Sequence, residues 1–340
     1  MGRSRRGFFC FGKDIGIDLG TSTVLVYVKG RGLVLTEPSL LAVDRQSRRL
    51  LKTGAEAQAL LSQTPGSLAA FRPIRQGVIS DYEKTVELLR VLLRDVRATG
   101  LFRPRLLISL PPGGTEVEAR AVIDAGLQAG ARQVRLLEQP LAALMGAGVE
   151  ITSPYGHMVV DVGGGTTDIA VVSLGQIMAS ASLKVAGDQF DEAIVKHVRS
   201  LHQVLLGVHG AELLKRSIGC AIPLTPEETV ETRGRDLETG LPKTLTITST
   251  EVVEAVDVPI QQVLEGIAEV LERTPPELAS DIAREGILLT GGGVLLRGLT
   301  QRISASCGLP VRLAEDPHTA VIYGLGKALE SAFDDRSGRA

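Results

Sequence analysis

One stretch of the chain, residues 159–171 with the sequence VVDVGGGTTDIAV, limits the choice of fold more than any other. Apolar residues on both sides of an acid, three glycines and two threonines predict two adjacent strands joined by a tight turn. Because glycine adopts positive φ easily and has no side chain, consecutive backbone N–H groups of such a turn can converge on an anion. We therefore expect this turn to hold a phosphate.

Asp161 stands at the carboxyl end of the first of these strands. A buried carboxylate without a partner is costly, so Asp161 is expected to face a cation, most naturally hydrated Mg²⁺ beside the phosphate. The alternative is an ordinary hairpin turn with one solvated acid. The length of the turn argues against that alternative, because common hairpin loops are shorter, as in Asn-Gly.

The same order of residues occurs near the N-terminus, where IGIDLGTSTVLV spans residues 15–26 and contains Asp18. Two copies of one pattern imply two similar lobes. A third glycine run, residues 291–293, follows the apolar strand of residues 287–290. It precedes a predicted helix, whose N-terminus can hold a phosphate or a nucleoside.

Together and in this order, the glycine motifs resemble the phosphate-1, phosphate-2 and adenosine motifs of the superfamily of actin, sugar-kinase and heat-shock-chaperone ATPases. Other segments are similar to the MreB family, the bacterial actins that determine rod shape: VLTEPS at 34–39, RPIRQGVI at 72–79, PLAA at 140–143 and PPELASDI at 275–282. The resemblance spans about residues 14–332. It implies an α/β, actin-like fold of two lobes, each built on a duplicated mixed sheet flanked by helices, with the nucleotide in the cleft between the lobes.

The resemblance also implies how the chain is divided. The first lobe is expected to comprise residues 14–150 and 312–340, with a small subdomain at about 32–79. The second lobe is expected to comprise residues 151–311, with a small subdomain at about 186–250. Gly308-Leu309-Pro310 would carry the chain back to the first lobe.

Capping residues and apolar spacing predict several helix boundaries. Capping boxes are expected at Ser80 and at Thr115 with Glu118. One helix is expected to begin at Gly187 and reach Leu206. Another should begin at Ser249 and be kinked or interrupted by Pro259.

The resemblance implies that the chain binds ATP and Mg²⁺. Asp18 and Asp161 would hold the hydrated metal, and Glu212 and Lys215 would lie near the ribose and adenine. The spacing of Glu212 and Lys215 on one helix face would by itself favour a solvated ion pair. The residues expected to bind the nucleotide are Gly20, Thr21, Ser22, Thr23, Gly163, Gly164, Gly165, Thr166, Glu212, Lys215, Gly291, Gly292, Gly293 and Val294.

Hydrolysis would depend on Asp161, Thr166 and Gln139. Many MreB-like proteins have Glu-Glu-Pro or Asp-Glu-Pro in the connecting segment, whereas this chain has Glu138-Gln139-Pro140. The amide of Gln139 can hold a water but cannot act as a strong general base, so we expect slow ATP hydrolysis.

Two segments are candidates for membrane contact. Residues 1–13 combine basic side chains with Phe8, Phe9 and Phe11, which suits a peripheral anchor on anionic lipid. The alternative is a frayed terminus with incidental basic residues. Leu101 and Phe102 lie on a predicted loop at which MreB-like proteins contact the membrane; the alternative is that they are tucked under a neighbouring element.

Composition argues against other classes of protein. A formal net charge of -2 over 340 residues gives no basic footprint for nucleic acid. The three cysteines lie far apart without metal-ligand spacing, which favours a reducing cytoplasm. The sequence contains no run of about 18 apolar residues, so it predicts no membrane-spanning helix.

The resemblance therefore implies an ATP-dependent filament protein that associates with itself. Such a protein would lie in the cytoplasm against the inner face of the plasma membrane, determine cell shape and organise the cell-wall elongation machinery. The alternatives are a small-molecule kinase, a chaperone or another non-filament ATPase of the same superfamily. Asp168 stands where glutamate is usual, which shortens the acid. Two further departures, Ser217 with Cys220 and Ile322-Tyr323, leave open a divergent paralogue with altered filament contacts.

Overall fold

The computed structural model describes residues 13–63, 67–96 and 103–333. Two mixed sheets of five strands each dominate it, in the orders β10-β9-β1-β2-β3 and β13-β12-β11-β17-β18. The strands of the first sheet are β1 (Asp14–Leu19), β2 (Thr23–Val28), β3 (Gly32–Pro38), β9 (Arg105–Leu110) and β10 (Gln133–Glu138). Those of the second are β11 (His157–Val162), β12 (Thr167–Ser173), β13 (Gln176–Leu183), β17 (Ile287–Thr290) and β18 (Val311–Leu313).

The two sheets share one topology. β1 pairs antiparallel with β2 and parallel with β9, and β11 pairs in the same way with β12 and β17. Asp18 and Asp161 occupy the last position but one of β1 and β11. The predicted duplication and the α/β, actin-like, two-lobed arrangement are therefore confirmed.

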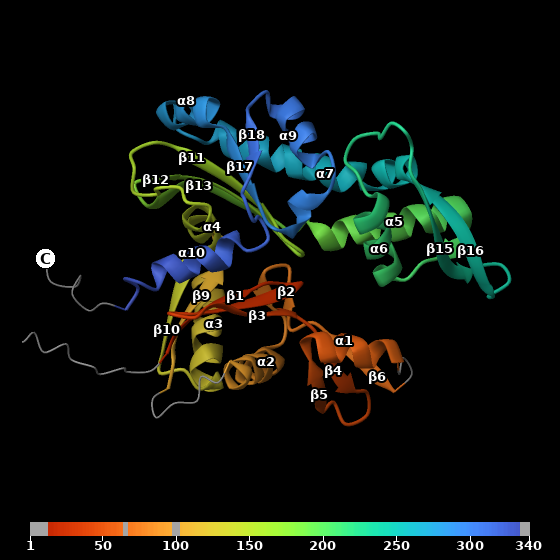
Figure 1. The fold of residues 1–340 in the computed structure, drawn as a ribbon, viewed down its shortest axis with the longest axis horizontal. Helices are drawn as coiled ribbons and strands as arrows, with labels where there is room; N and C mark the ends of the chain where they lie inside the picture. The colour runs from red at the N-terminus through yellow and green to blue at the C-terminus, as the bar shows by residue number, and fades with distance from the viewer. Residues whose placement is uncertain (1–12, 64–66, 97–102, 334–340) are drawn as a thin grey trace, which may run out of the picture.

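Helices cover both sheets, as Figure 1 shows. The helices α2 (Tyr82–Asp95) and α3 (Glu116–Ala129) pack on the first sheet, and α7 (Ser249–Glu272), α8 (Pro276–Glu285) and α9 (Leu299–Cys307) lie over the second. Between the two sheets run α4 (Gln139–Gly146) and α10 (Ala320–Ala328). This layer joins the lobes, because one apolar core combines Leu25 and Leu107 of the first sheet with Val159 and Leu288 of the second.

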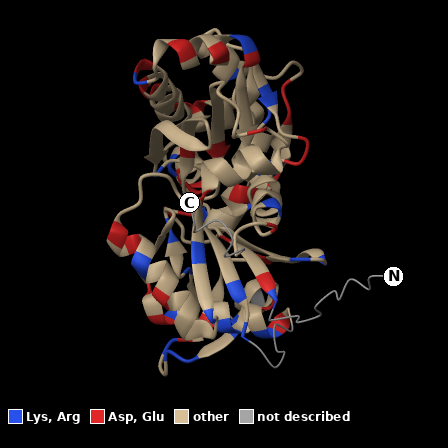
Figure 2. Cartoon of the chain, turned by 90° about the vertical axis from the view of Figure 1, so that its left-hand side faces the viewer, with Lys and Arg blue, Asp and Glu red and all other residues tan. Residues whose placement is uncertain are grey.

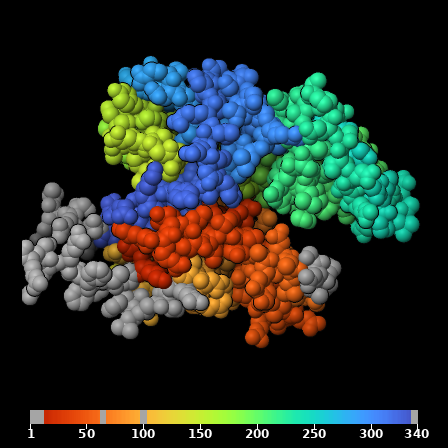
Figure 3. Space-filling model, in the orientation of Figure 1, coloured from red at the N-terminus to blue at the C-terminus, as the bar shows by residue number. Residues whose placement is uncertain are grey.

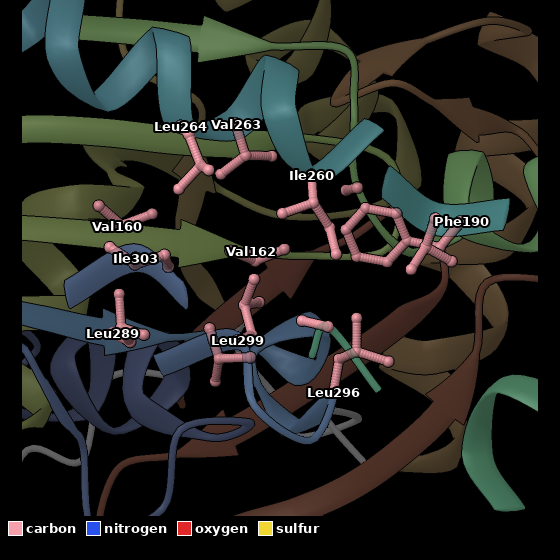
Figure 4. Packing of buried hydrophobic residues seen from close by; sticks show 14 of the residues in the cluster. Val160, Val162, Phe190, Ile260, Val263, Leu264, Leu289, Leu296, Leu299 and Ile303 are labelled. Atoms are coloured by element: carbon pink, nitrogen blue, oxygen red, sulfur yellow. The ribbon is translucent and has the colours of Figure 1, made fainter. Parts of the chain in front are cut away.

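The largest core lies within the second lobe. In Figure 4, Val160 and Val162 from β11, Leu289 from β17 and Val263 from α7 point toward one another. Strands buried on both faces need continuous apolar runs, and β11 has only one charged residue, Asp161, in its buried stretch. Asp161 is thus a single acid within a strand buried among apolar side chains.

Each lobe also carries a smaller α/β unit, and both units lie on the right in Figure 1. In the first lobe it consists of β4 (Leu41–Asp44), β5 (Leu50–Thr53), β6 (Leu68–Phe71) and α1 (Gly54–Gln63). In the second it consists of α5 (Gly187–His202), β14 (Val204–Leu205), α6 (Val208–Ile218), β15 (Thr229–Asp236) and β16 (Pro242–Thr248). Figure 3 shows the surface hollowed between the two units.

Some helix boundaries differ from the prediction. The N-cap before α2 is Asp81, one residue after the predicted Ser80, and its carboxylate accepts from the backbone N–H of Lys84. Because a lysine then occupies the third helical position, the predicted capping box does not form. The helix from Gly187 ends at His202, because Gln203 takes a left-handed conformation and the next residues pair with β15. The predicted box of Thr115 with Glu118 is confirmed.

Two further predictions need correction. The helix that begins at Ser249 is continuous through Pro259, so the predicted interruption is wrong. The apolar stripe of α7 is buried along its whole length, and that packing outweighs one lost backbone hydrogen bond. After Gly308-Leu309-Pro310 the chain first forms β18, because these residues can still pair with β17, and it leaves the second sheet only after Leu313.

The surface carries mixed charge. Figure 2 shows Lys and Arg interspersed with Asp and Glu along the described chain in both lobes. Within the described ranges no helix is long and apolar enough to span a bilayer.

Candidate functional site

The first and second glycine turns lie directly against each other, although they come from different lobes. A Cβ atom placed on Gly164 would lie 2.5 Å from Cβ of Ser22, and one on Gly165 would lie 2.6 Å from Oγ1 of Thr21. Real side chains do not tolerate such distances, so both positions require glycine. The β1–β2 and β11–β12 turns therefore form one continuous cradle of backbone and hydroxyl groups between the lobes.

Three carboxylates lie at the base of this cradle, each held by a hydroxyl. Oγ of Ser109 on β9 donates to Asp18 (2.7 Å), and Oγ1 of Thr290 on β17 donates to Asp161 (2.8 Å). Asp168 on β12 pairs directly across from Asp161 and accepts from Ser182 (2.5 Å). Neighbouring strands of a mixed sheet thus bring the acids together.

Burial makes it costly for these acids to ionise together. Burial raises the pKa of Asp161 to about 7, and the charges of Asp168 and Asp18 add to the effect. Burial likewise raises the pKa of Asp168 to about 6 and raises that of Asp18. A nearby cation would offset this repulsion and favour the ionised forms.

The acids suit a hydrated cation better than a bare one. Among the residues that the structure describes, no group of three or more acidic, histidine or cysteine side chains is arranged to ligate an ion directly. Mg²⁺ usually keeps several waters and takes one or two carboxylates together with phosphate oxygens. Asp18 and Asp161 could therefore hold it through water.

Gln139, the first residue of α4, projects into the same place. Its side chain lies close enough to the Asp18 carboxyl to offset part of the rise in its pKa, and its Oε1 is buried without a hydrogen-bond partner among the described residues. Buried acceptors are nearly always paired, so an orphaned acceptor indicates a position for water or ligand. Thr166, the other residue predicted to orient water, is buried and donates from Oγ1 to Asp168 (3.1 Å).

Lys215 and Glu212 lie on one face of α6 but do not pair with each other. Nζ of Lys215 lies 2.8 Å from Asp191 and donates to the carbonyl of Gly187 (2.9 Å), and Gly187 in turn is hydrogen-bonded to Gly163 of the second turn. Burial raises the pKa of Asp191 to about 6 despite the nearby lysine. Glu212 is partly exposed and lies 3.9 Å from Arg216. Lys215 therefore belongs to the wall of the cradle, and Glu212 lies further out.

The third glycine run approaches the end of β11. A Cβ atom on Gly293 would lie 2.5 Å from Cγ1 of Val162, and Gly291 has a φ of +88° and donates its N–H to the carbonyl of Pro317 (2.7 Å). The run does lie at a helix N-terminus, with Gly291 as the N-cap, but the helix is a short 3-10 helix, Gly292–Leu295. The backbone approach is close, with Gly292 exposed and Val294 buried.

The other predicted nucleotide-binding residues border the first turn. A Cβ atom on Gly20 would lie 2.5 Å from the carbonyl oxygen of Thr23, so the turn closes tightly on itself. The residues proposed to contact a membrane, Phe8, Phe9, Phe11, Leu101 and Phe102, lie outside the described residues.

Several supporting residues were not predicted. Ser109, Thr290 and Ser182 orient the acids, and the only signal in the sequence was a hydroxyl within an otherwise apolar or small-residue strand. His318, whose Nδ1 would lie 3.2 Å from a Cβ atom on Gly292, borders the third run. No short motif marks these positions, because they meet the acids only through strand pairing.

Comparison with known proteins gives a consistent result. Residues 12–336 match the family model described as MreB/Mbl protein. The chain is 44% identical over 322 residues to the cell shape-determining protein Mbl of Bacillus subtilis, covering 94% of this chain and 97% of that one. It is also 44% identical over 327 residues to the cell shape-determining protein MreB of Escherichia coli, covering 94% of each.

Solved structures agree with these relatives. MreB5 of Spiroplasma citri bound to AMPPNP superposes with a TM-score of 0.90 at 36% identity, over 94% of this chain and 97% of that one. The same protein bound to ADP gives a TM-score of 0.91 at 35% identity, over 96% and 99%. A MamK double helical filament has a TM-score of 0.80 at 20% identity over 94% and 98%, a likeness of fold alone.

Proposed function

Because the chain belongs to the MreB/Mbl family of actin-like proteins, we propose that it is an ATP-dependent filament protein that determines cell shape. Its relatives in Bacillus subtilis and Escherichia coli are named for that role. The observation that carries the proposal is the contact between the two glycine turns, with Asp18 and Asp161 at their base. The crystallised relatives that hold AMPPNP and ADP support nucleotide binding at this cradle.

In this proposal the cradle holds the phosphates of ATP. Backbone N–H groups of Gly164 and Gly165 and the hydroxyl of Thr21 are the donors, because the N–H of Gly163 is already bonded to the carbonyl of Thr166 and Oγ1 of Thr166 to Asp168. Asp18 and Asp161 hold Mg²⁺ through its waters, and the ion would supply positive charge beside the phosphates. The third glycine run and Lys215 border the nucleoside, with Glu212 at the outer edge.

Hydrolysis is proposed to be slow. No described residue bonds the buried Oε1 of Gln139, which can therefore accept from an attacking water. Thr166, which is also buried, lies in the second glycine turn. Positioning without a strong base forgoes the factor of about 10²–10⁴ that general-base catalysis contributes. Slow turnover suits a filament in which each subunit hydrolyses its ATP some time after it has joined the filament.

The proposed lobes are residues 14–150 with 314–340 and residues 151–313, because β18 still pairs in the second sheet. A head-to-tail contact between copies, which does not close on itself, would produce the filament. The filament is proposed to lie in the cytoplasm against the inner membrane and to organise cell-wall synthesis. No nucleic acid partner is proposed.

The test is polymerisation of the purified protein. With Mg-ATP, light scattering should rise and negative-stain electron microscopy on a lipid monolayer should show filaments, whereas the nucleotide-free sample should show neither. Nucleotide binding by fluorescence titration is measured alongside. Binding without polymer under any nucleotide condition would contradict the filament proposal, and sugar-dependent release of ADP would favour a kinase.

A further inference from the structure

An ion pair joins the two lobes beside the phosphate cradle. Nη1 of Arg72, in the first lobe, lies 3.0 Å from Oδ1 and 2.9 Å from Oδ2 of Asp188, in the second lobe. Both side chains are partly buried, with 37% of Arg72 and 27% of Asp188 exposed. Residues 116 positions apart in the chain thus meet across the interlobe gap.

Asp188 is fixed to the second glycine turn. Its backbone N–H donates to the carbonyl of Gly164 (2.8 Å), and the N–H of Gly187 donates to that of Gly163 (3.2 Å). Asp188 also lies in the first turn of α5, where a carboxylate is favoured by the helix dipole. The position of the Asp188 side chain is therefore coupled, through backbone hydrogen bonds, to the turn proposed to hold phosphate.

Arg72 is fixed to the first glycine turn by a short hairpin, β7 (Ile74–Arg75) and β8 (Val78–Ile79). Ser80 at the end of this hairpin donates from Oγ to the carbonyl of Arg72 (3.1 Å). At the tip, the N–H of Gly77 donates to Oγ1 of Thr21 (3.1 Å), and a Cβ atom there would lie 3.0 Å from Cγ2 of Thr166. Gly77 has a φ of +76°, which favours glycine at this tip.

From these contacts we propose that the Arg72–Asp188 pair is a clasp that holds the two lobes closed over the phosphates and slows the release of nucleotide. The proposal rests on the nucleotide-binding function proposed above. Arg72 and Asp188 act as positioning residues, because each is bonded to the backbone or hairpin that shapes one glycine turn. Opening the cleft must break this pair, whereas binding of nucleotide to either turn leaves it intact.

The clasp should be moderate in strength. Partly exposed ion pairs are screened by salt and contribute less than buried ones. We therefore expect loss of the pair to speed nucleotide release about three- to tenfold at low salt, with a smaller factor at high salt.

The test uses near-isosteric neutral variants of the full chain: Arg72→Gln, Asp188→Asn and the double variant. Release of a fluorescent ADP analogue is timed by stopped flow at low and high salt. Each single variant should release the analogue faster, and the double variant should be no faster than the singles, since both changes break one interaction. Arg75→Gln, an exposed arginine in the same hairpin, is the matched control and should release at the wild-type rate.

Hydrogen exchange of nucleotide-free protein provides a measurement that does not depend on nucleotide. Residues 74–79 should exchange faster in both single variants than in wild type and the Arg75→Gln control. Wild-type release rates in the variants, additive effects in the double variant, or unchanged exchange of the hairpin would each overturn the clasp. A wild-type protein that fails to bind the analogue would instead count against the proposed nucleotide site, and the exchange data would still decide the clasp.

Discussion

At the scale of single residues, the site is marked by buried polar groups whose charge or hydrogen-bonding capacity the described residues do not fully compensate. Asp161 lies in a buried strand beside Asp168, and both carboxyls take up protons more readily than usual as a result. Gln139 keeps one buried acceptor that no described residue satisfies. Such features cost stability in the free protein and are relieved when a cation or water arrives, which is why they mark a binding site.

The raised pKa of Asp161 leads to a prediction about pH. In nucleotide-free protein with EDTA, burial raises the pKa of the native carboxyl to about 7 from its ordinary value of 3.8. Between these values the native state holds more protons than the unfolded state, so stability should fall as pH rises from about 4 through 7 and then level off. Thermal unfolding measured from pH 5 to 8 checks this.

Asp161→Asn should flatten that pH dependence and raise the Tm at pH 7.5 by roughly 2–4 °C, the shift expected for about 1 kcal/mol in a large domain. The amide oxygen can still accept from Thr290, so the packing should survive. Asp124→Asn, an exposed acid on α3, is the control and should leave the wild-type profile unchanged. A profile of equal slope in Asp161→Asn and wild type would contradict the assignment.

Gln139 supports a second prediction at this scale. Gln139→Glu places a base where the orphaned acceptor lies, so single-turnover phosphate release should accelerate about tenfold or more, toward the usual range for general-base catalysis. Rapid mixing with a phosphate sensor measures the rate. Gln128→Glu, the same change on the exposed face of α3, should have no effect. Equal rates for Gln139→Glu and wild type would mean that the residue does not face the water.

At the scale of elements, the helices α4 and α10 make the closest contact in the layer between the lobes. Cβ atoms added at Gly146 and Gly324 would overlap the backbone carbonyls of Ala320 and Ala142. The two helices can therefore touch backbone to backbone only because both crossing positions are glycine. Since α4 and α10 link the sheets, this crossing sets the distance between the lobes.

Gly324→Ala should therefore destabilise the protein, although alanine is the better helix former. Overpacking typically costs about 1–3 kcal/mol, and chemical denaturation would measure the loss. Gly114→Ala is the control, because a Cβ atom there meets only ordinary contacts beyond 3.6 Å. Equal stability of the two variants would show that α4 and α10 can separate without cost.

Sequence patterns predicted the elements well where one local signal decides the outcome. The glycine motifs, the alternation of strands and helices and the Thr115 capping box all depend on neighbouring residues. The sequence patterns failed where contacts with residues distant in the sequence decide the local structure. Residues 204–205, predicted as helix, pair with β15 instead. Pro259 is tolerated because α7 is buried, and Ser109 reaches Asp18 only through the pairing of β9 with β1.

At the scale of the whole molecule, the cradle exists only when the two lobes are together. Gly164 and Gly165 belong to the second lobe and meet Ser22 and Thr21 of the first, and the acids divide in the same way between Asp18 and Asp161. A ligand that engages both turns must therefore stabilise the closed arrangement, and the closed arrangement must in turn bind it more tightly. This link is what allows a nucleotide to control the shape of a subunit.

The same link predicts how ligand and metal act together on stability. ATP with Mg²⁺ at about 100 times its dissociation constant should add about 2.7 kcal/mol to the free energy of unfolding, visible as a higher Tm. ATP with EDTA should add less, because the acids then face the phosphates without a cation between them. In Asp18→Asn the difference between the Mg²⁺ and EDTA samples should shrink, while Asp95→Asn, an exposed acid at the end of α2, should keep it. If ATP stabilises wild type to the same extent with and without Mg²⁺, the carboxylates from the two lobes do not share a cation. Nucleotide binding would then have to close the lobes through the glycine turns alone.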